Sequence, residues 1–132
     1  MLPSNVVYLN NKGLEIEGIR LWGSPTTPDL EDWAFGKSRA EMEEHWRYLP
    51  TDIDVLITHT PPLGILDRSS ARVPLGCEAL LRRVRELRPK YHIFGHIHAS
   101  YGRLEWEGTI YLNASIMNSY LGPVNAPMVF DL

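Results

Sequence analysis

The chain has 132 residues, of which 44% are hydrophobic and 22% charged, a composition typical of a globular domain and not of a disordered segment. This length predicts a single partial or complete domain over residues 1–132. Thirteen basic and sixteen acidic residues give a net charge of −3, so we expect no nucleic-acid surface. No apolar run approaches the length of a membrane span, and the single cysteine, Cys77, cannot form an intramolecular disulfide. We therefore expect no membrane association and a reducing, cytoplasmic location.

The N-terminal part of the chain predicts β structure. Residues 6–9 form an apolar run typical of a short strand, and residues 10–13 have turn composition. Residues 14–17 and 19–22 alternate apolar and polar side chains on either side of Gly18. They predict a hairpin that buries four apolar side chains on one face. These side chains are Leu14, Ile16, Ile19 and Leu21.

Two amphipathic helices are predicted further along the chain. Ser38 and Glu41 fit a capping box, and the helix that they begin ends before Pro50. Apolar residues at helical spacing from Cys77 to Leu87 predict the second helix, which Pro89 ends. The expected apolar faces are Met42, Trp46 and Leu49 in the first helix, and Cys77, Leu80, Leu81, Val84 and Leu87 in the second.

Two short apolar runs each lead into a loop that carries histidine. Residues 55–58 precede His59, and residues 91–94 precede the motif Gly95-His96-Ile97-His98. Because a helix separates the two runs, they predict a βαβ unit with parallel strands and neighbouring carboxyl ends. Ligands of open α/β sheets bind beyond such ends.

His59, His96 and His98 are therefore candidate metal ligands, because neutral imidazole is the commonest protein ligand of metals. Residues two apart on an extended segment point the same way, so we expect His96 and His98 to face one centre or two neighbouring centres. We expect Gly95 to allow a close backbone turn beside that centre. The alternative is that a His-x-His motif lies on the surface by chance.

Other polar residues receive lesser roles. We interpret His45 and His92 as structural. Asp67 is the nearest carboxylate after His59, and it either joins a metal shell or forms a turn, the more common role of Asp in such a segment. Asn113 follows a predicted hairpin over residues 103–112 and is a candidate to support the metal ligands through hydrogen bonds. Residues 128–132 are predicted to form a last strand.

These motifs resemble the calcineurin-like metallophosphoesterase superfamily, and in particular its metallophosphoesterase-domain-containing (MPPED-like) branch. The residues that carry the resemblance are Gly23-Ser24-Pro25 through Trp33, Thr58-His59-Thr60-Pro61-Pro62-Leu63-Gly64, Gly95-His96-Ile97-His98-Ala99-Ser100-Tyr101-Gly102, and Asn113-Ala114-Ser115. The similarity extends over nearly the whole chain. The two histidine motifs in this order are far more specific than either motif alone.

The resemblance implies an α/β fold: the C-terminal half of a four-layer α/β/β/α sandwich, with mixed sheets and a βαβ unit. It implies hydrolysis of phosphoesters, in particular phosphodiesters such as cyclic nucleotides, by a dinuclear centre of divalent ions (Mn, Fe, Zn or Mg). By the family pattern, His59 and His96 would bind one ion and His98 the other.

The chain lacks three motifs of this family: Asp-x-His, Gly-Asp-x-x-Asp and Gly-Asn-His followed by Asp or Glu. The bridging carboxylate and the histidine that assists the leaving group are therefore expected outside this chain, either in an N-terminal half or in a partner. Alone, the chain is expected to bind at most one ion weakly and to be inactive. It would need an N-terminal half for full activity, or self-association to cover its open face. The competing hypothesis is a non-catalytic metal-binding or interaction module.

Overall fold

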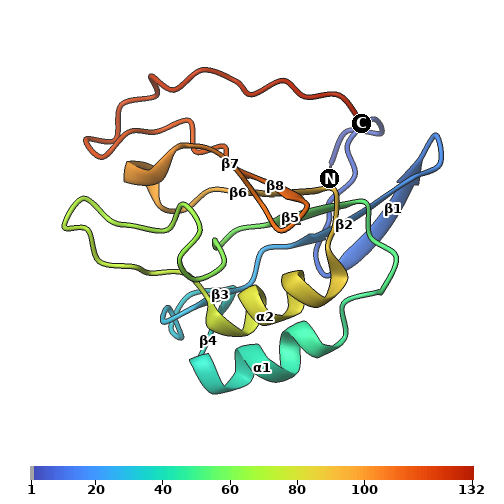
Figure 1. The fold of residues 1–132 in the computed structure, drawn as a ribbon, viewed down its shortest axis with the longest axis horizontal. Coiled ribbons are helices and arrows are strands. Elements are labelled where there is room, and N and C mark those ends of the chain that lie inside the picture. Colours follow the sequence, from blue (N-terminus) through green and yellow to red (C-terminus); the bar gives the residue numbers. More distant parts are fainter. Residues whose placement is uncertain (1) are drawn as a thin grey trace.

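A six-stranded mixed sheet forms the centre of the structure, a computed structural model that describes residues 2–132 (Figure 1). Its strand order is β1-β2-β5-β6-β8-β7, with β2, β5, β6 and β8 parallel and both edge strands antiparallel to their neighbours. A separate two-stranded sheet pairs β3 with β4. The strands are β1 (Lys12–Ile16), β2 (Ile19–Ser24), β3 (Thr27–Pro28), β4 (Gly36–Lys37), β5 (Val55–Thr58), β6 (Tyr91–Phe94), β7 (Gly102–Trp106) and β8 (Thr109–Asn113).

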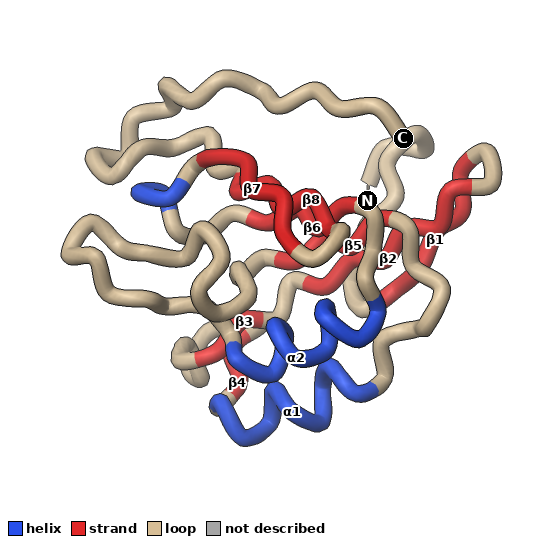
Figure 2. Tube along the Cα trace, viewed as in Figure 1, coloured by secondary structure: helices blue, strands red, loops and turns tan. Residues whose placement is uncertain are grey.

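Two helices, α1 (Arg39–Arg47) and α2 (Glu78–Leu87), cover the same face of this sheet (Figure 2). The capping box of α1 is confirmed, because the backbone N–H of Glu41 donates to Ser38 Oγ and the Glu41 carboxylate accepts the Ser38 N–H at 2.8 Å. α2 connects the parallel strands β5 and β6, which confirms the βαβ unit. A 3-10 turn, η1 (His98–Ser100), follows β6. Within residues 2–132 no helix has the length and apolarity that a membrane span requires.

The core lies between these helices and the sheet. Met42 and Trp46 of α1 and Leu80 and Val84 of α2 are at most 1% exposed, and Leu56 of β5 meets them from the sheet. Since side chains alternate along a strand, the same face also receives Phe94 and Tyr111 from the next strands. The apolar helix faces predicted from the sequence therefore make up this core.

The opposite face of the sheet is covered only thinly within the described chain. Three of its apolar side chains are buried, and five more are half-buried. The C-terminal tail crosses this face, where Met128 and Phe130 pack on it and Tyr91 Oη donates to the Asp131 carbonyl at 2.8 Å (Figure 1). The buried residues are Val55, Tyr91 and Leu112, and the half-buried ones are Ile19, Leu21, Ile57, Ile93 and Ile110.

Two strand predictions were wrong. Residues 6–9 and 128–132 form no strand, because neither segment pairs with another strand in the described part of the chain. The turn predicted over residues 10–13 is confirmed only at Asn10 and Asn11, where the chain bends and Asn11 has a left-handed φ of 52°, because β1 already begins at Lys12. The hairpin turn lies at Glu17-Gly18, where both residues have positive φ. The predicted hairpin is confirmed, but Ile16 remains 51% exposed because β1 is an edge strand.

Candidate metal centre

The carboxyl ends of β5 and β6 lie side by side, as predicted. His59 directly follows β5, and its backbone extends the ladder on both sides. Its N–H donates to the Ser24 carbonyl at 3.1 Å, and its carbonyl accepts the Gly95 N–H at 3.3 Å. The sheet itself therefore fixes the backbone that presents His59 beside the His96 loop.

His59 and His96 face each other across this edge. The distance between His59 Nε2 and His96 Nδ1 is 3.0 Å, and the ring centroids are 4.5 Å apart. Two nitrogens at about 2.1 Å from one ion, at roughly 90–110° to each other, would be about 3.0–3.4 Å apart. The two nitrogens form a hydrogen bond at this distance, and the same spacing would suit two ligands of one divalent ion.

Both rings favour the neutral form that binds metals. Partial desolvation lowers the pKa of His59, although part of its side chain stays exposed. Burial also lowers the pKa of the half-buried His96, and the neighbouring His59 and His98 rings lower it further. Neutral imidazoles carry the free lone pair that a metal ion needs.

His98 lies near this pair but does not complete a three-ligand group. His96 has a left-handed φ of 66° and His98 begins η1, so the expected extended His-x-His segment was wrong. Both side chains line one open hollow of about 290 Å³, beside Ser69 and Ser70. Across residues 2–132, no three side chains of His, Cys, Asp or Glu gather closely enough to hold one ion. The assignment of His98 to a second ion therefore stays a prediction.

The close backbone contact in these loops is made at Gly76, and the role expected for Gly95 beside the centre stays a prediction. A Cβ on Gly95 would meet only Ser115 Cα, at 3.9 Å. A Cβ on Gly76 would lie 2.5 Å from the Pro62 carbonyl oxygen and 2.6 Å from the Leu63 backbone. Gly76 therefore lets the segment before α2 pack directly against the loop that follows His59.

The Asn113 side chain supports the histidine loop by hydrogen bonds to the backbone of that loop. This fully buried side chain donates from Nδ2 to the carbonyls of Leu66, at 3.0 Å, and Ile97, at 2.9 Å. Its Oδ1 accepts the Ser115 N–H at 3.2 Å. Ile97 lies between the two histidines of the motif, so Asn113 ties their loop to the end of β8.

Asp67 forms a turn. Its Oδ2 accepts the N–H groups of Gly64, at 2.8 Å, and Gly76, at 3.0 Å, and the side chain is only 1% exposed. The structural interpretation also holds for the two other histidines. His45 Nε2 lies 3.1 Å from Ser24 Oγ, and His92 Nε2 lies 2.9 Å from Thr58 Oγ1.

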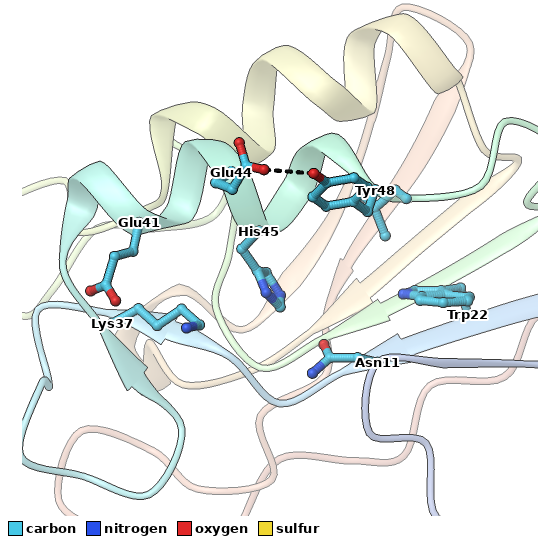
Figure 3. Close-up of a pocket in the computed structure, with 8 residues that line it drawn as sticks. Asn11, Trp22, Lys37, Glu41, Glu44, His45 and Tyr48 are labelled. Carbon is cyan, nitrogen blue, oxygen red and sulfur yellow. Dashed lines mark hydrogen bonds between the residues drawn. The ribbon is translucent and has the colours of Figure 1, made fainter.

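A larger hollow, of about 480 Å³, lies elsewhere, between α1 and the start of the sheet (Figure 3). Three of its polar side chains already have partners inside the protein. Glu41 caps α1, Glu44 accepts the Tyr48 hydroxyl at 2.7 Å, and His45 bonds Ser24. Size alone favours this hollow, but the facing pair of imidazoles lies at the strand ends. The chemistry therefore places the candidate site there.

Comparison with known proteins identifies the family of the chain. The family model for calcineurin-like phosphoesterases matches residues 3–100. The chain is 41% identical to UPF0046 protein T07D4.2 of Caenorhabditis elegans, over 99% of this chain and 34% of that protein. It is 40% identical to metallophosphoesterase domain-containing protein 1 of Homo sapiens, over 99% of this chain and 41% of that protein. The chain thus spans between a third and a half of the length of these relatives.

A solved crystal structure shares the fold. It superposes with a TM-score of 0.63 at 20% sequence identity, covering 81% of this chain and 45% of the other. This likeness concerns the arrangement of strands and helices alone. The family model, which covers residues 3–100, shows that the chain belongs to the calcineurin-like phosphoesterase family, and the relatives at about 40% identity agree with it.

Proposed function

We propose that this chain supplies the histidine ligands of a divalent-metal phosphoesterase centre, and that residues outside the chain complete that centre. The observation that carries the proposal is the 3.0 Å approach of His59 Nε2 and His96 Nδ1 at the carboxyl edge of parallel strands. Membership of the family supports a phosphoesterase-type hydrolase. The finer assignment, a phosphodiesterase, rests on the similarity to the metallophosphoesterase-domain-containing proteins.

In this proposal the pair His59 and His96 binds the first ion, and His98 contributes to a second. Divalent ions, when bound, would polarise the phosphoryl group and make a water molecule more acidic. The chain's own residues hold the ligands. The ladder bonds of His59 fix the backbone that carries one ring, and Asn113 fixes the loop that carries the other two. Desolvation keeps His59 and His96 ready to bind an ion at neutral pH.

Two features favour a further half of the domain. Three imidazoles carry no negative charge, so they cannot neutralise or bridge two divalent ions, and the family's carboxylate motifs are absent from the sequence. The face of the sheet opposite the helices keeps Ile57 and Ile93 only half-buried. An N-terminal half that covers this face would also bring the carboxylates.

A second candidate is a non-catalytic metal-binding or interaction module. It is favoured by the lack of any three-ligand group in residues 2–132. In that case the histidine pair would bind an ion without activating a substrate, and the open sheet face would bind a partner or a second copy.

Hydrolysis of a chromogenic phosphodiester with added Mn²⁺ separates these candidates. We expect no activity from the chain alone, and activity once the N-terminal part of a relative is supplied. The variant His96→Ala should abolish the restored activity, whereas His45→Ala, a histidine outside the pair, should retain it. If complementation forms a complex that remains inactive while the chain binds Mn²⁺, the non-catalytic module is supported instead.

A further inference from the structure

A buried hydrogen-bonded group lies directly behind His59. Thr58, the last residue of β5, donates from its hydroxyl to the Thr60 carbonyl at 2.7 Å. The same hydroxyl lies 2.9 Å from His92 Nε2. His92 and Thr60 are fully buried, and Thr58 is 5% exposed. The bonds therefore join the residues on both sides of His59 to the neighbouring strand β6.

The donors in this group are fixed by chemistry. A hydroxyl has a single hydrogen, and Thr58 uses it for the Thr60 carbonyl. The Thr58 oxygen must then accept from His92, so His92 carries its proton on Nε2. This leaves His92 Nδ1 as a bare acceptor, and Nδ1 is buried without a partner. Burial lowers the pKa of His92 to about 3, so the ring stays neutral.

The arrangement follows from the register of the sheet. Leu56 pairs with His92 across β5 and β6, and Thr58 lies two residues further along the same face as Leu56. A long side chain reaches such a diagonal neighbour. An apolar side chain would fill the position of His92 without leaving a buried Nδ1 unpaired, which is unfavourable. A buried histidine is therefore a poor choice for stability alone. Its hydrogen bond to Thr58, next to His59, indicates a second role.

We propose that Thr58 and His92 form a brace that sets the backbone on either side of His59 and thereby the position of its ring toward His96. The inference rests on the proposed metal-binding role of His59. Thr58 and His92 touch no ion or substrate and are positioning residues. Groups that orient metal ligands typically change metal affinity by about 10–100-fold when they are removed.

The chain offers a matched control at the far end of the sheet. Thr109, at the start of β8, is 1% exposed and donates from its hydroxyl to the Pro89 carbonyl at 2.8 Å. The variant Thr109→Val removes one buried bond from a hydroxyl to a carbonyl, like the bond from Thr58 to Thr60, but no bond to a histidine. It lies at the amino end of a parallel strand, away from the histidines.

The test measures Co²⁺ affinity from the visible absorption of the bound ion, and stability from urea unfolding. We expect Thr58→Val to weaken Co²⁺ binding at least tenfold, whereas Thr58→Ser should bind Co²⁺ within threefold of the unsubstituted chain. Thr109→Val should leave Co²⁺ affinity unchanged while it loses stability similar to the loss in Thr58→Val. His92→Leu should also weaken binding, without a matching loss of stability at neutral pH. Unchanged affinity in Thr58→Val, or equal losses in Thr58→Val and Thr109→Val, would overturn the inference.

Amide hydrogen exchange without metal separates this inference from the proposed function. Thr58→Val should speed exchange of the Leu63 N–H, which bonds the Cys77 carbonyl in the loop after His59, at least tenfold. Thr109→Val should not change it. If the unsubstituted chain fails to bind Co²⁺, the proposed function fails, but altered exchange would still support the brace. Unaltered exchange in Thr58→Val would contradict it.

Discussion

The two faces of the central sheet differ in how completely they are packed. On one face, α1 and α2 bury Met42, Leu80 and Val84 completely. On the other, Ile57 and Ile93 stay half-buried under a single extended tail. The helix-covered face is therefore packed completely by residues of this chain, and the opposite face is not. The opposite face is the one that, in the proposed function, a further part of the domain would cover.

The largest expected effect contrasts one residue on each face. Leu80→Ala should destabilise the chain by about 2–5 kcal/mol, because it leaves a cavity in a closed core. Ile93→Ala should cost less than half as much, since its surroundings already admit water. Urea unfolding of both variants measures the difference. Equal losses would show that the two faces are packed alike.

The next effect concerns the loop after His59. Gly76→Ala should destabilise the chain by about 1–3 kcal/mol, because the added methyl overlaps the Pro62 and Leu63 backbone. Gly95→Ala is its control, with only an ordinary contact at 3.9 Å, and should change stability little. Thermal unfolding compares the two variants. A larger loss in Gly95→Ala would reverse our account of which glycine the site requires.

The pH dependence of stability should reflect His92, which is fully buried on the helix-covered face of the sheet. The pKa of His92 is about 3 in the folded chain, against 6.5 for a histidine exposed to water, so the unfolded chain binds the proton more readily. The contribution of neutral His92 to the free energy of unfolding is therefore fully present above about pH 6.5. It is lost as the pH falls toward 3, by about 1.4 kcal/mol per pH unit. Urea unfolding between pH 7 and 4 should show a smaller slope for His92→Leu. An unchanged slope would mean that His92 is not neutral and buried.

The smallest effect concerns the tail on the open face. The ring of Phe130 lies 4.5 Å from that of Tyr91, and Phe130→Ala should cost only about 0.5–1.5 kcal/mol. Urea unfolding again provides the measurement. A loss as large as that of Leu80→Ala would make the tail a full part of the core and weaken the contrast between the two faces.

Local chemistry explains which parts of the fold could be predicted. Ser38 and Glu41 determine the start of α1 through contacts within one turn, and alternation around Gly18 determines a hairpin. Residues 6–9 and 128–132 have equally good strand composition but no partner strand within residues 2–132, and strand formation depends on such distant partners.

In the candidate site, too, local sequence predicts some features, and others depend on distant parts of the chain. Motif spacing correctly placed His59 and His96 at neighbouring strand ends. It could not reveal the left-handed backbone of His96, because that conformation depends on the loop around it. The bond between Thr58 and His92 requires the strand register, which spacing in one sequence does not give.

The most direct test of the central claim is a Co²⁺ titration of the chain, followed by visible absorption, with His59→Ala, His96→Ala and His45→Ala in parallel. If His59 and His96 share an ion, the unsubstituted chain and His45→Ala will bind Co²⁺, and either substitution in the pair will abolish that binding. Binding that survives unchanged in both His59→Ala and His96→Ala would contradict the claim.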